Sequence, residues 1–372
     1  MSIGLTTPSK LKVKLIGYYR KMEIPIKNIY YLLCYAWNKL EERDIVNIQG
    51  IEATTIYDLF AKVLAEGTTR LLKMGLERGY VCKSEETYSI RGKIDFGTSL
   101  KRNTLQYARV QCQFDELNHN ILHNQILKST LKRLIEIESL DNGLKERLFN
   151  LCFRLNEVED IPLNKTVFRR IQFHKNNSFY EFLLKICELV VYNLLPSEQK
   201  GQSKFRDFVR DEAQMAVLFE EFIRNFYKIE QTFYKVYRED IYWDISAKDE
   251  ESMRYLPKMQ TDISLESKNN KIIIDAKYYR EALNVYYDQE KIKNENMRQI
   301  SSYLDNLNKD VLVNKDCAGI LLYPTVSKQL DINYKYHGHP ISFKTINLNQ
   351  DWHNIHKDML RIVNLKDEIK EI

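Results

Sequence analysis

The sequence has no closely spaced pair of cysteines and no long, uninterrupted apolar run. No apolar stretch approaches the roughly 18 residues that a membrane-spanning helix requires, so we predict no membrane association. The basic start, residues 1–21, lacks the apolar core of a signal peptide, and we expect it to be an N-terminal extension of a cytoplasmic protein. The six cysteines stand singly, which is typical of reduced, buried thiols rather than of a disulfide or zinc motif: Cys34, Cys82, Cys112, Cys152, Cys187 and Cys317.

Glycine and proline are also scarce, and neither positive nor negative charge is in large excess. The 372 residues include only 12 Gly and 7 Pro, and 44% are apolar, which indicates a globular protein long enough for two domains. Basic residues number 56 and acidic residues 51, so the net charge of +5 only weakly favours nucleic acid as a partner. The phosphate-binding pattern G-x-x-x-x-G-K-[ST] does not occur, so we expect any nucleotide to be bound by another chain.

The N-terminal half is predicted to combine amphipathic helices with a β element. Residues 79–96 and 104–114 alternate like strands, and a helix is predicted from Asp115, which would be its N-cap. The less regular segment 156–175 is the predicted domain junction. Apolar residues recur at helical spacing in four further segments: 26–40, 55–75, 142–155 and 178–195.

Two small groups of polar residues in this half have both a functional and a simpler interpretation. Arg91 and Lys93 fall on a tight turn, from which a basic side chain could reach the nucleotide interface of a partner. A solvated turn is the simpler alternative. His119 and His123 have the spacing of two zinc ligands, but the catalytic glutamate and a third ligand are missing, so a helix surface is the favoured interpretation.

The C-terminal half is predicted to be an α/β sheet with covering helices, and it contains the main candidate site. TDISLE and KIIIDAK, separated by a turn, indicate an antiparallel pair of strands. Asp275 and Lys277 are two residues apart, so they point to the same face of one strand, and Asp262 on the neighbouring strand can reach that face. Ordinary strand-end charges are the alternative. The apolar run before Asp275 argues against it, because an exposed edge strand would be less apolar.

Two nearby carboxylates repel each other unless a cation lies between them. Mg²⁺ prefers oxygen ligands and keeps several waters, and a lysine beside it can stabilise charge on a phosphate. Such a site predicts metal-assisted hydrolysis of a phosphodiester. On the following helix, Gln299 and Tyr303 lie at i and i+4, on one side.

These motifs together resemble the PD-(D/E)xK nuclease superfamily, with TD in place of PD. The resemblance implies a restriction-endonuclease-like mixed sheet flanked by helices, in which Asp262 and Asp275 hold Mg²⁺ and Lys277 assists. It also implies a supporting acid on the helix LFEEFI, either Glu220 or Glu221, and supporting roles for Gln299 and Tyr303. Five basic residues near the site are candidate phosphate contacts: Lys258, Lys271, Arg280, Lys291 and Lys293.

A closer resemblance runs from about Ile24 to the C-terminus. IPIKNIYYLLCYAWN, IRGKIDF, FDELNHNILHNQILKSTL and MQTDI…IIIDAKYY are similar, in this order, to the McrC family, the nuclease subunits of the McrBC modification-dependent restriction systems. The resemblance implies a magnesium-dependent DNA endonuclease subunit of a GTP-dependent type IV restriction system specific for 5-methylcytosine. Its implied partners are modified double-stranded DNA and the hexameric AAA+ GTPase McrB, which binds the GTP.

The resemblance also implies a division of labour. We expect an α+β partner-docking domain with a projecting β element over residues 22–165, which stimulates the GTPase, and an endonuclease domain over 166–372. Two alternatives stay open: a GTPase-activating subunit with an inactive nuclease site, and a self-sufficient nuclease.

Overall fold

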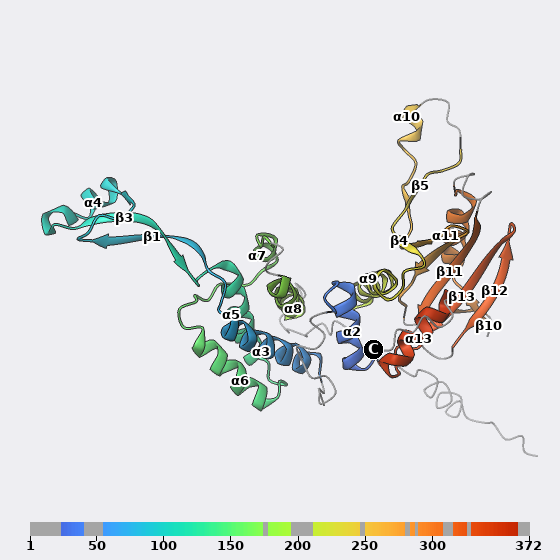
Figure 1. Cartoon of the computed structure of the whole chain (residues 1–372), viewed down its shortest axis with the longest axis horizontal. Coiled ribbons are helices and arrows are strands. Elements are labelled where there is room, and N and C mark those ends of the chain that lie inside the picture. The colour runs from blue at the N-terminus through green and yellow to red at the C-terminus, as the bar shows by residue number, and fades with distance from the viewer. Residues whose placement is uncertain are drawn as a thin grey trace, which may run out of the picture. The chain divides into compact units, whose positions relative to one another are not determined.

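The computed structural model describes residues 24–40, 55–173, 178–194, 211–245, 250–279, 283–286, 289–307, 315–325 and 329–363 (Figure 1). The chain divides into two compact units, the first made of residues 1–40 and 207–372 and the second of residues 41–206. No helix within the described ranges is long and apolar enough to cross a membrane.

These units do not follow the expected boundary between residues 165 and 166. Helix α2 (Ile26–Ala36) packs against α9 (Glu212–Glu230) of the C-terminal half, through ring contacts such as Tyr35 with Phe222. Helix α8 (Ser178–Leu194) packs instead against N-terminal helices. The amphipathic patterns predicted these helices but not the partner that each apolar face would meet.

The second unit has a body of helices, which are predicted well by their periodicity. Helix α3 (Ile56–Met74) begins at a capping box, in which the Thr55 hydroxyl accepts from the Asp58 amide at 3.1 Å and the Asp58 carboxylate accepts from the Thr55 amide at 3.0 Å. It ends before Gly75, whose φ of +96° suits glycine. Around it lie α5 (Leu122–Ile135), α6 (Asn142–Arg154), α7 (Lys165–Arg169) and α8.

An antiparallel arm projects from this body, as the sequence predicted. Strand β1 (Gly79–Thr87) pairs with β3 (Val110–Asn118), and the short β2 (Lys93–Ile94) pairs with the other side of β3. Helix α4 (Phe96–Lys101) and the 3-10 helix η3 (Thr104–Tyr107) lie at the far end of the arm (Figure 1). Gly92 has φ +61°, and a Cβ there would lie 2.4 Å from the carbonyl oxygen of Gln113, so this bend requires glycine.

The helix predicted from Asp115 begins seven residues later. Asp115 lies on β3, opposite Cys82 of β1, and α5 begins at Leu122. The acidic residue resembled an N-cap, but nine consecutive residue pairs with β1 continue the strand as far as Asn118. Long-range pairing therefore overrides the local signal.

The first unit is built on a six-stranded mixed sheet in the order β12-β13-β11-β8-β7-β4. β11 pairs parallel with β8 and β13, while the other neighbouring pairs are antiparallel. This α/β architecture confirms the predicted fold class. The strands are β4 (Lys235–Tyr237), β7 (Ile263–Glu266), β8 (Asn270–Ala276), β11 (Asp316–Pro324), β12 (Asp331–Tyr336) and β13 (His339–Ile346).

Two short hairpins and a one-turn helix lie outside this sheet. β5 (Asp240–Ile241) pairs with β6 (Met259–Gln260), and α10 (Glu250–Met253) falls between them in the chain. β9 (Leu283–Tyr286) pairs with β10 (Gln289–Ile292), and the helix that carries Gln299 and Tyr303 begins after this hairpin.

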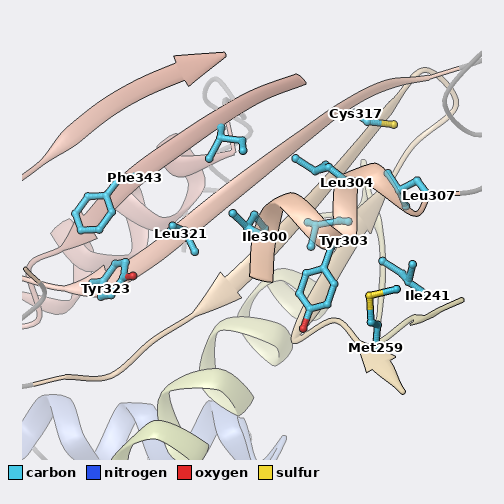
Figure 2. Packing of buried hydrophobic residues seen from close by; sticks show 12 residues of the cluster. Ile241, Met259, Ile300, Tyr303, Leu304, Leu307, Cys317, Leu321, Tyr323 and Phe343 are labelled. Carbon is cyan, nitrogen blue, oxygen red and sulfur yellow. The ribbon is translucent and has the colours of Figure 1, made fainter. Parts of the chain in front are cut away.

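Helix α11 (Asn294–Asp305) covers one face of the sheet. Its Ile300 and Leu304 pack against Leu321 of β11, together with Ile273, Tyr323 and Phe343 from the sheet (Figure 2). At Gly319 the helix approaches so closely that a Cβ would lie 2.7 Å from Ile300 Cγ1. Helix α9 contacts β4, β7 and β8, and α13 (Trp352–Ile362) stacks Trp352 on Tyr31 and Tyr35 of α2.

Candidate active site

Asp262, Asp275 and Lys277 meet where β7 begins and β8 ends. The hairpin pairs Ile263 with Ile274, so Asp262 lies beside the end of β8 that carries Asp275. Asp275 is fully buried and lies opposite Leu321 of the parallel neighbour β11. The structure therefore brings together the three side chains that the sequence singled out; their catalytic role remains a prediction.

Asp262 is held by the backbone of the neighbouring strand. It precedes the first residue of β7, and its Oδ2 accepts a hydrogen bond of 3.0 Å from the Ala276 amide. This side chain thus pairs with a backbone donor just beyond the last β7–β8 residue pair. The contact fixes one carboxylate oxygen beside the end of β8.

Lys277 follows the strand and joins the two acids. Its Nζ lies 2.9 Å from Asp275 Oδ1 and 3.9 Å from Asp262 Oδ2, and its side chain is 17% exposed. Its amide donates to Leu322 of β11 at 2.9 Å, which fixes the backbone from which the side chain extends. The cation is therefore within reach of both carboxylates and of solvent.

The electrostatics of the site favour a bound cation. Burial raises the pKa of Asp275 to about 7; Lys277 opposes this rise, and the nearby Asp262 adds to it. Burial opposes the charge on Lys277, but attraction to Asp275 and Asp262 outweighs it, and the pKa of Lys277 lies above its usual value. One lysine therefore does not fully compensate the buried carboxylate.

The remaining oxygen of Asp275 is well placed to bind a cation. Asp275 Oδ2 is buried, and no donor in the described part of the chain reaches it. Among the described residues, no cluster of three or more His, Cys, Asp or Glu could hold a metal ion, so the chain offers two carboxylates here. Two carboxylates and water suit Mg²⁺, which seldom binds in an all-protein cage. The donor set fits that ion.

Gln299 and Tyr303 lie beside the site and support its backbone. On α11 the Gln299 amide donates to the Tyr303 hydroxyl at 2.8 Å, and this hydroxyl donates to the carbonyl of Gln260 at 2.9 Å. Burial raises the pKa of Tyr303, and the charges of Asp275 and Asp262 add to this effect. Figure 2 shows Tyr303 extending from α11 towards Met259 of β6.

Glu220 and Glu221, the expected supporting acids, are bound by arginines. Glu220 contacts Arg224 at 3.2 Å and also contacts Arg238, while Glu221 contacts the other terminal nitrogen of Arg224. Since no three-acid cluster occurs among the described residues, neither glutamate joins Asp262 and Asp275 here. The i, i+3 and i, i+4 positions of Arg224 on the same helix bring it to both acids.

The basic candidates have different surroundings. Lys271 is 1% exposed and ion-paired with Glu239, so the structure contradicts a phosphate contact for it. Lys258 is exposed and pairs with Asp240 at 2.8 Å, whereas Lys293 lies 3.5 Å from the centre of the Tyr279 ring. Lys291 is exposed, and Arg280 lies outside the described residues.

On the arm, Arg91 and Lys93 are exposed, as a turn predicts. Arg91 lies 4.8 Å from the centre of the Phe114 ring and 3.8 Å from Glu85. His123 contacts Glu77 at 3.1 Å, and His119 accepts from Arg78.

Sequence reasoning missed the residues that surround Thr261, immediately before Asp262. The buried Lys271 and the partly exposed Glu239 form an ion pair there, although they are 32 residues apart in the chain. Only the pairing of the sheet brings them together, and no spacing rule could have identified them.

Fold and site define a protein of two units in which a carboxylate–lysine site lies on a mixed α/β sheet. A family model described as McrBC 5-methylcytosine restriction system component matches residues 21–324. The chain is 33% identical over 339 residues to the type IV methyl-directed restriction enzyme EcoKMcrBC of Escherichia coli (strain K12), which covers 91% of this chain and 97% of that protein. The chain therefore belongs to the family of McrBC restriction system components.

A solved structure has the same fold. It is a half-complex from a tetradecameric assembly of Thermococcus gammatolerans McrB AAA+ hexamers with bound McrC. The match has a TM-score of 0.57 at 15% identity and covers 91% of this chain and 75% of the other. The expected resemblance to McrC is confirmed.

Proposed function

We propose that this chain is the Mg²⁺-dependent DNA endonuclease subunit of a GTP-dependent, 5-methylcytosine-specific type IV restriction system. The observation that carries the proposal is the convergence of Asp262 and Lys277 on Asp275, whose buried Oδ2 lacks a donor. Membership of the McrBC family supports the same conclusion. The motif and its geometry suit the PD-(D/E)xK class.

Each residue of the site has a distinct task in this proposal. When bound, Mg²⁺ supplies Lewis-acid stabilisation of the scissile phosphate. Asp262 and Asp275 hold the ion and, once ionised, keep it at the end of β8. Lys277, which is partly exposed, donates to a phosphate oxygen and stabilises the negative charge that develops there. Gln299 and Tyr303 hold the Gln260 backbone and so support Asp262.

The arm suits a docking role towards a protein partner. Its far end exposes large apolar side chains, with Phe96 60%, Leu100 66% and Tyr107 66% exposed, which is costly for a surface that only meets water. We propose that residues 22–165 bind an McrB-like AAA+ GTPase hexamer, which carries the GTP, and that Arg91 and Lys93 contribute to stimulating it. McrB hexamers with bound McrC in the archaeal structure support this choice of partner.

The test separates the two activities. Asp275→Ala should abolish cleavage of methylated DNA by the complex of this chain, its GTPase partner, GTP and Mg²⁺, and should leave the stimulation of GTP hydrolysis intact. Asp316→Ala, at an exposed position at the start of β11, is the matched control and should cleave normally. Loss of both activities in a folded Asp275→Ala protein would contradict the division of labour.

The same experiment decides between the proposal and its alternatives. A GTPase-activating subunit with an inactive nuclease site would stimulate the partner but cleave no DNA in its native form. A self-sufficient nuclease would cleave without the partner or GTP. The exposed apolar end of the arm argues against the second alternative, because a nuclease acting alone has no use for it.

A further inference from the structure

A largely buried polar group on the first unit surrounds the residue that precedes Asp262. We call this group the Thr261 clamp; it consists of Glu239, Thr261, Ser264 and Lys271. Thr261, Ser264 and Lys271 are each no more than 1% exposed, although their side chains are polar or charged. Charged side chains are almost never fully buried without a partner, so the clamp requires an explanation.

Lys271 is the charged centre of the clamp. Its Nζ lies 2.7 Å from Glu239 Oε2 and 2.8 Å from Oε1, and it also donates to the Tyr237 hydroxyl at 3.3 Å. A buried ion pair is a poor source of stability, because the loss of hydration offsets most of the attraction. A geometric role explains better why two charges occupy this position.

Glu239 transmits the position of this pair to Thr261 through its backbone. The Thr261 amide donates to the Glu239 carbonyl at 2.9 Å, and the Glu239 amide donates to the Thr261 hydroxyl at 3.0 Å. This hydroxyl also bonds Ser264 Oγ at 2.9 Å, and Ser264 donates to Glu239 Oε2 at 3.3 Å. These hydrogen bonds form a closed ring, which includes the amide and the hydroxyl of Thr261 but not its carbonyl.

The chain therefore enters Asp262 from a fixed direction. Tyr303 holds the carbonyl of Gln260 on one side, the clamp holds Thr261, and the Ala276 amide holds the Asp262 carboxylate. Within the described part of the chain, Asp262 makes no hydrogen bond to the clamp, so the effect of Lys271 and Glu239 on it passes through the Thr261 backbone. A small rotation there would move a carboxylate whose ligand geometry must be near ideal for Mg²⁺.

We propose that Lys271 and Glu239 are positioning residues, which hold Asp262 in the orientation that binds the divalent cation. The inference rests on the proposed function, because it takes Asp262 and Asp275 to be metal ligands. Residues that orient a ligand without touching the metal change metal affinity by about 10- to 100-fold when they are removed. The clamp would therefore tune metal binding rather than the fold.

The test measures metal binding directly on the full chain. Mn²⁺, used as a probe, is titrated while electron paramagnetic resonance detects the free ion. The double variant Glu239→Gln/Lys271→Met removes both charges together, and we expect an about tenfold weaker Mn²⁺ affinity and a matching rise in the Mg²⁺ concentration needed for cleavage. The matched control, Asp331→Asn/Lys344→Met, removes a cross-strand ion pair with a 3.5 Å contact between β12 and β13, two strands that carry no residue of the clamp, and it should bind Mn²⁺ normally.

A second pair of variants decides the question if the double variant does not fold. Thr261→Val loses the hydroxyl and should weaken Mn²⁺ binding, whereas Thr261→Ser keeps it and should restore the binding. Wild-type Mn²⁺ affinity in a folded double variant, or equal affinities in the two Thr261 variants, would overturn the inference. Failure of the proposed function looks different: Asp275→Ala would then bind Mn²⁺ as well as the native chain does.

Discussion

Gly319→Ala tests whether α11 is packed as closely on β11 as the structure shows. The new Cβ would lie 2.7 Å from Ile300 Cγ1 and 3.2 Å from Leu304 Cδ1, well inside the roughly 3.5–4.0 Å at which carbon atoms attract. Alanine in a strand would otherwise gain about 0.5–1 kcal/mol over glycine. Overpacking costs about 1–3 kcal/mol. We therefore expect a net loss of about 1–2 kcal/mol in the free energy of unfolding.

Urea unfolding followed by tryptophan fluorescence measures this loss. The three tryptophans, Trp37, Trp243 and Trp352, all belong to the first unit, so the signal reports the unit that contains Gly319. Ile300→Ala alone should cost about 2–5 kcal/mol, but it removes the atoms that the new methyl group meets. The double variant should thus be at least about 1 kcal/mol more stable than the sum of the single effects predicts.

Two results would refute this reasoning. One is a Gly319→Ala protein that is as stable as the native chain or more stable. The other is strict additivity with Ile300→Ala, which would mean that the two positions do not share the contact. Gly97→Ala on the arm is the control, because the nearest atom to its Cβ is an Asp95 oxygen at 3.5 Å, an ordinary contact. Gly97 belongs to the second unit, so its unfolding is followed by far-ultraviolet circular dichroism, which should show no loss of stability.

Three further predictions follow from buried polar groups. The pKa of Asp275 is about 7 in the folded chain and about 3.9 in the unfolded chain. Without divalent cations, the native chain should therefore lose up to about 4 kcal/mol in the free energy of unfolding between pH 4 and 8. Urea unfolding at each pH measures this loss, and Asp275→Asn should abolish it. Tyr303→Phe removes the bond to the Gln260 carbonyl and should cost about 1 kcal/mol and reduce DNA cleavage, measured by urea unfolding and a plasmid assay. Asn124→Ala, which leaves the Tyr180 hydroxyl without its buried acceptor, should cost about 1–3 kcal/mol and speed hydrogen exchange at the base of the arm.

The sign of the Asp275 prediction follows from proton binding. Between the two pKa values the folded chain keeps a proton that the unfolded chain has released, so the unfolded state gains on the folded one as the pH rises. The penalty is absent below about pH 4 and complete above about pH 8. The contrary result is a free energy of unfolding that rises with pH over this window in the native chain but does not change in Asp275→Asn. It would show that the attraction of Lys277 for the Asp275 carboxylate exceeds the cost of burying it.

The sequence predicted the elements with strong periodicity and the residues with a local motif. The alternation of KIIIDAK fixed which side chains share a face, so the meeting of Asp275 and Lys277 followed from one strand. Pairing with TDISLE then brought Asp262 to them. In contrast, the strand that extends through Asp115 depends on nine pairs with a distant partner, and no local pattern signals them.

Burial was the harder quantity to predict. Lys271 was expected at a phosphate, because lysine near a nuclease motif is usually exposed, yet its partner Glu239 lies on a different segment and encloses it. The unit that α2 and α8 each join could not be predicted for the same reason: both helices have an apolar face, but amphipathicity does not say which unit covers it.

The pairing register of β8 decides which of its side chains lie on the face that carries the site. Lys271, Ile273 and Asp275 are alternate residues, so all three point towards the side covered by α11, where Ile273 joins the apolar core. A shift by one residue would place Ile272 and Ile274 there and turn both charged side chains to the opposite face. The pairs of Ile273 with Gly319 and Ser264 exclude that shift, since α11 approaches the sheet closely at Gly319. The packing at this glycine therefore helps to place Asp275 at one end of the strand and Lys271 at the other on the same face.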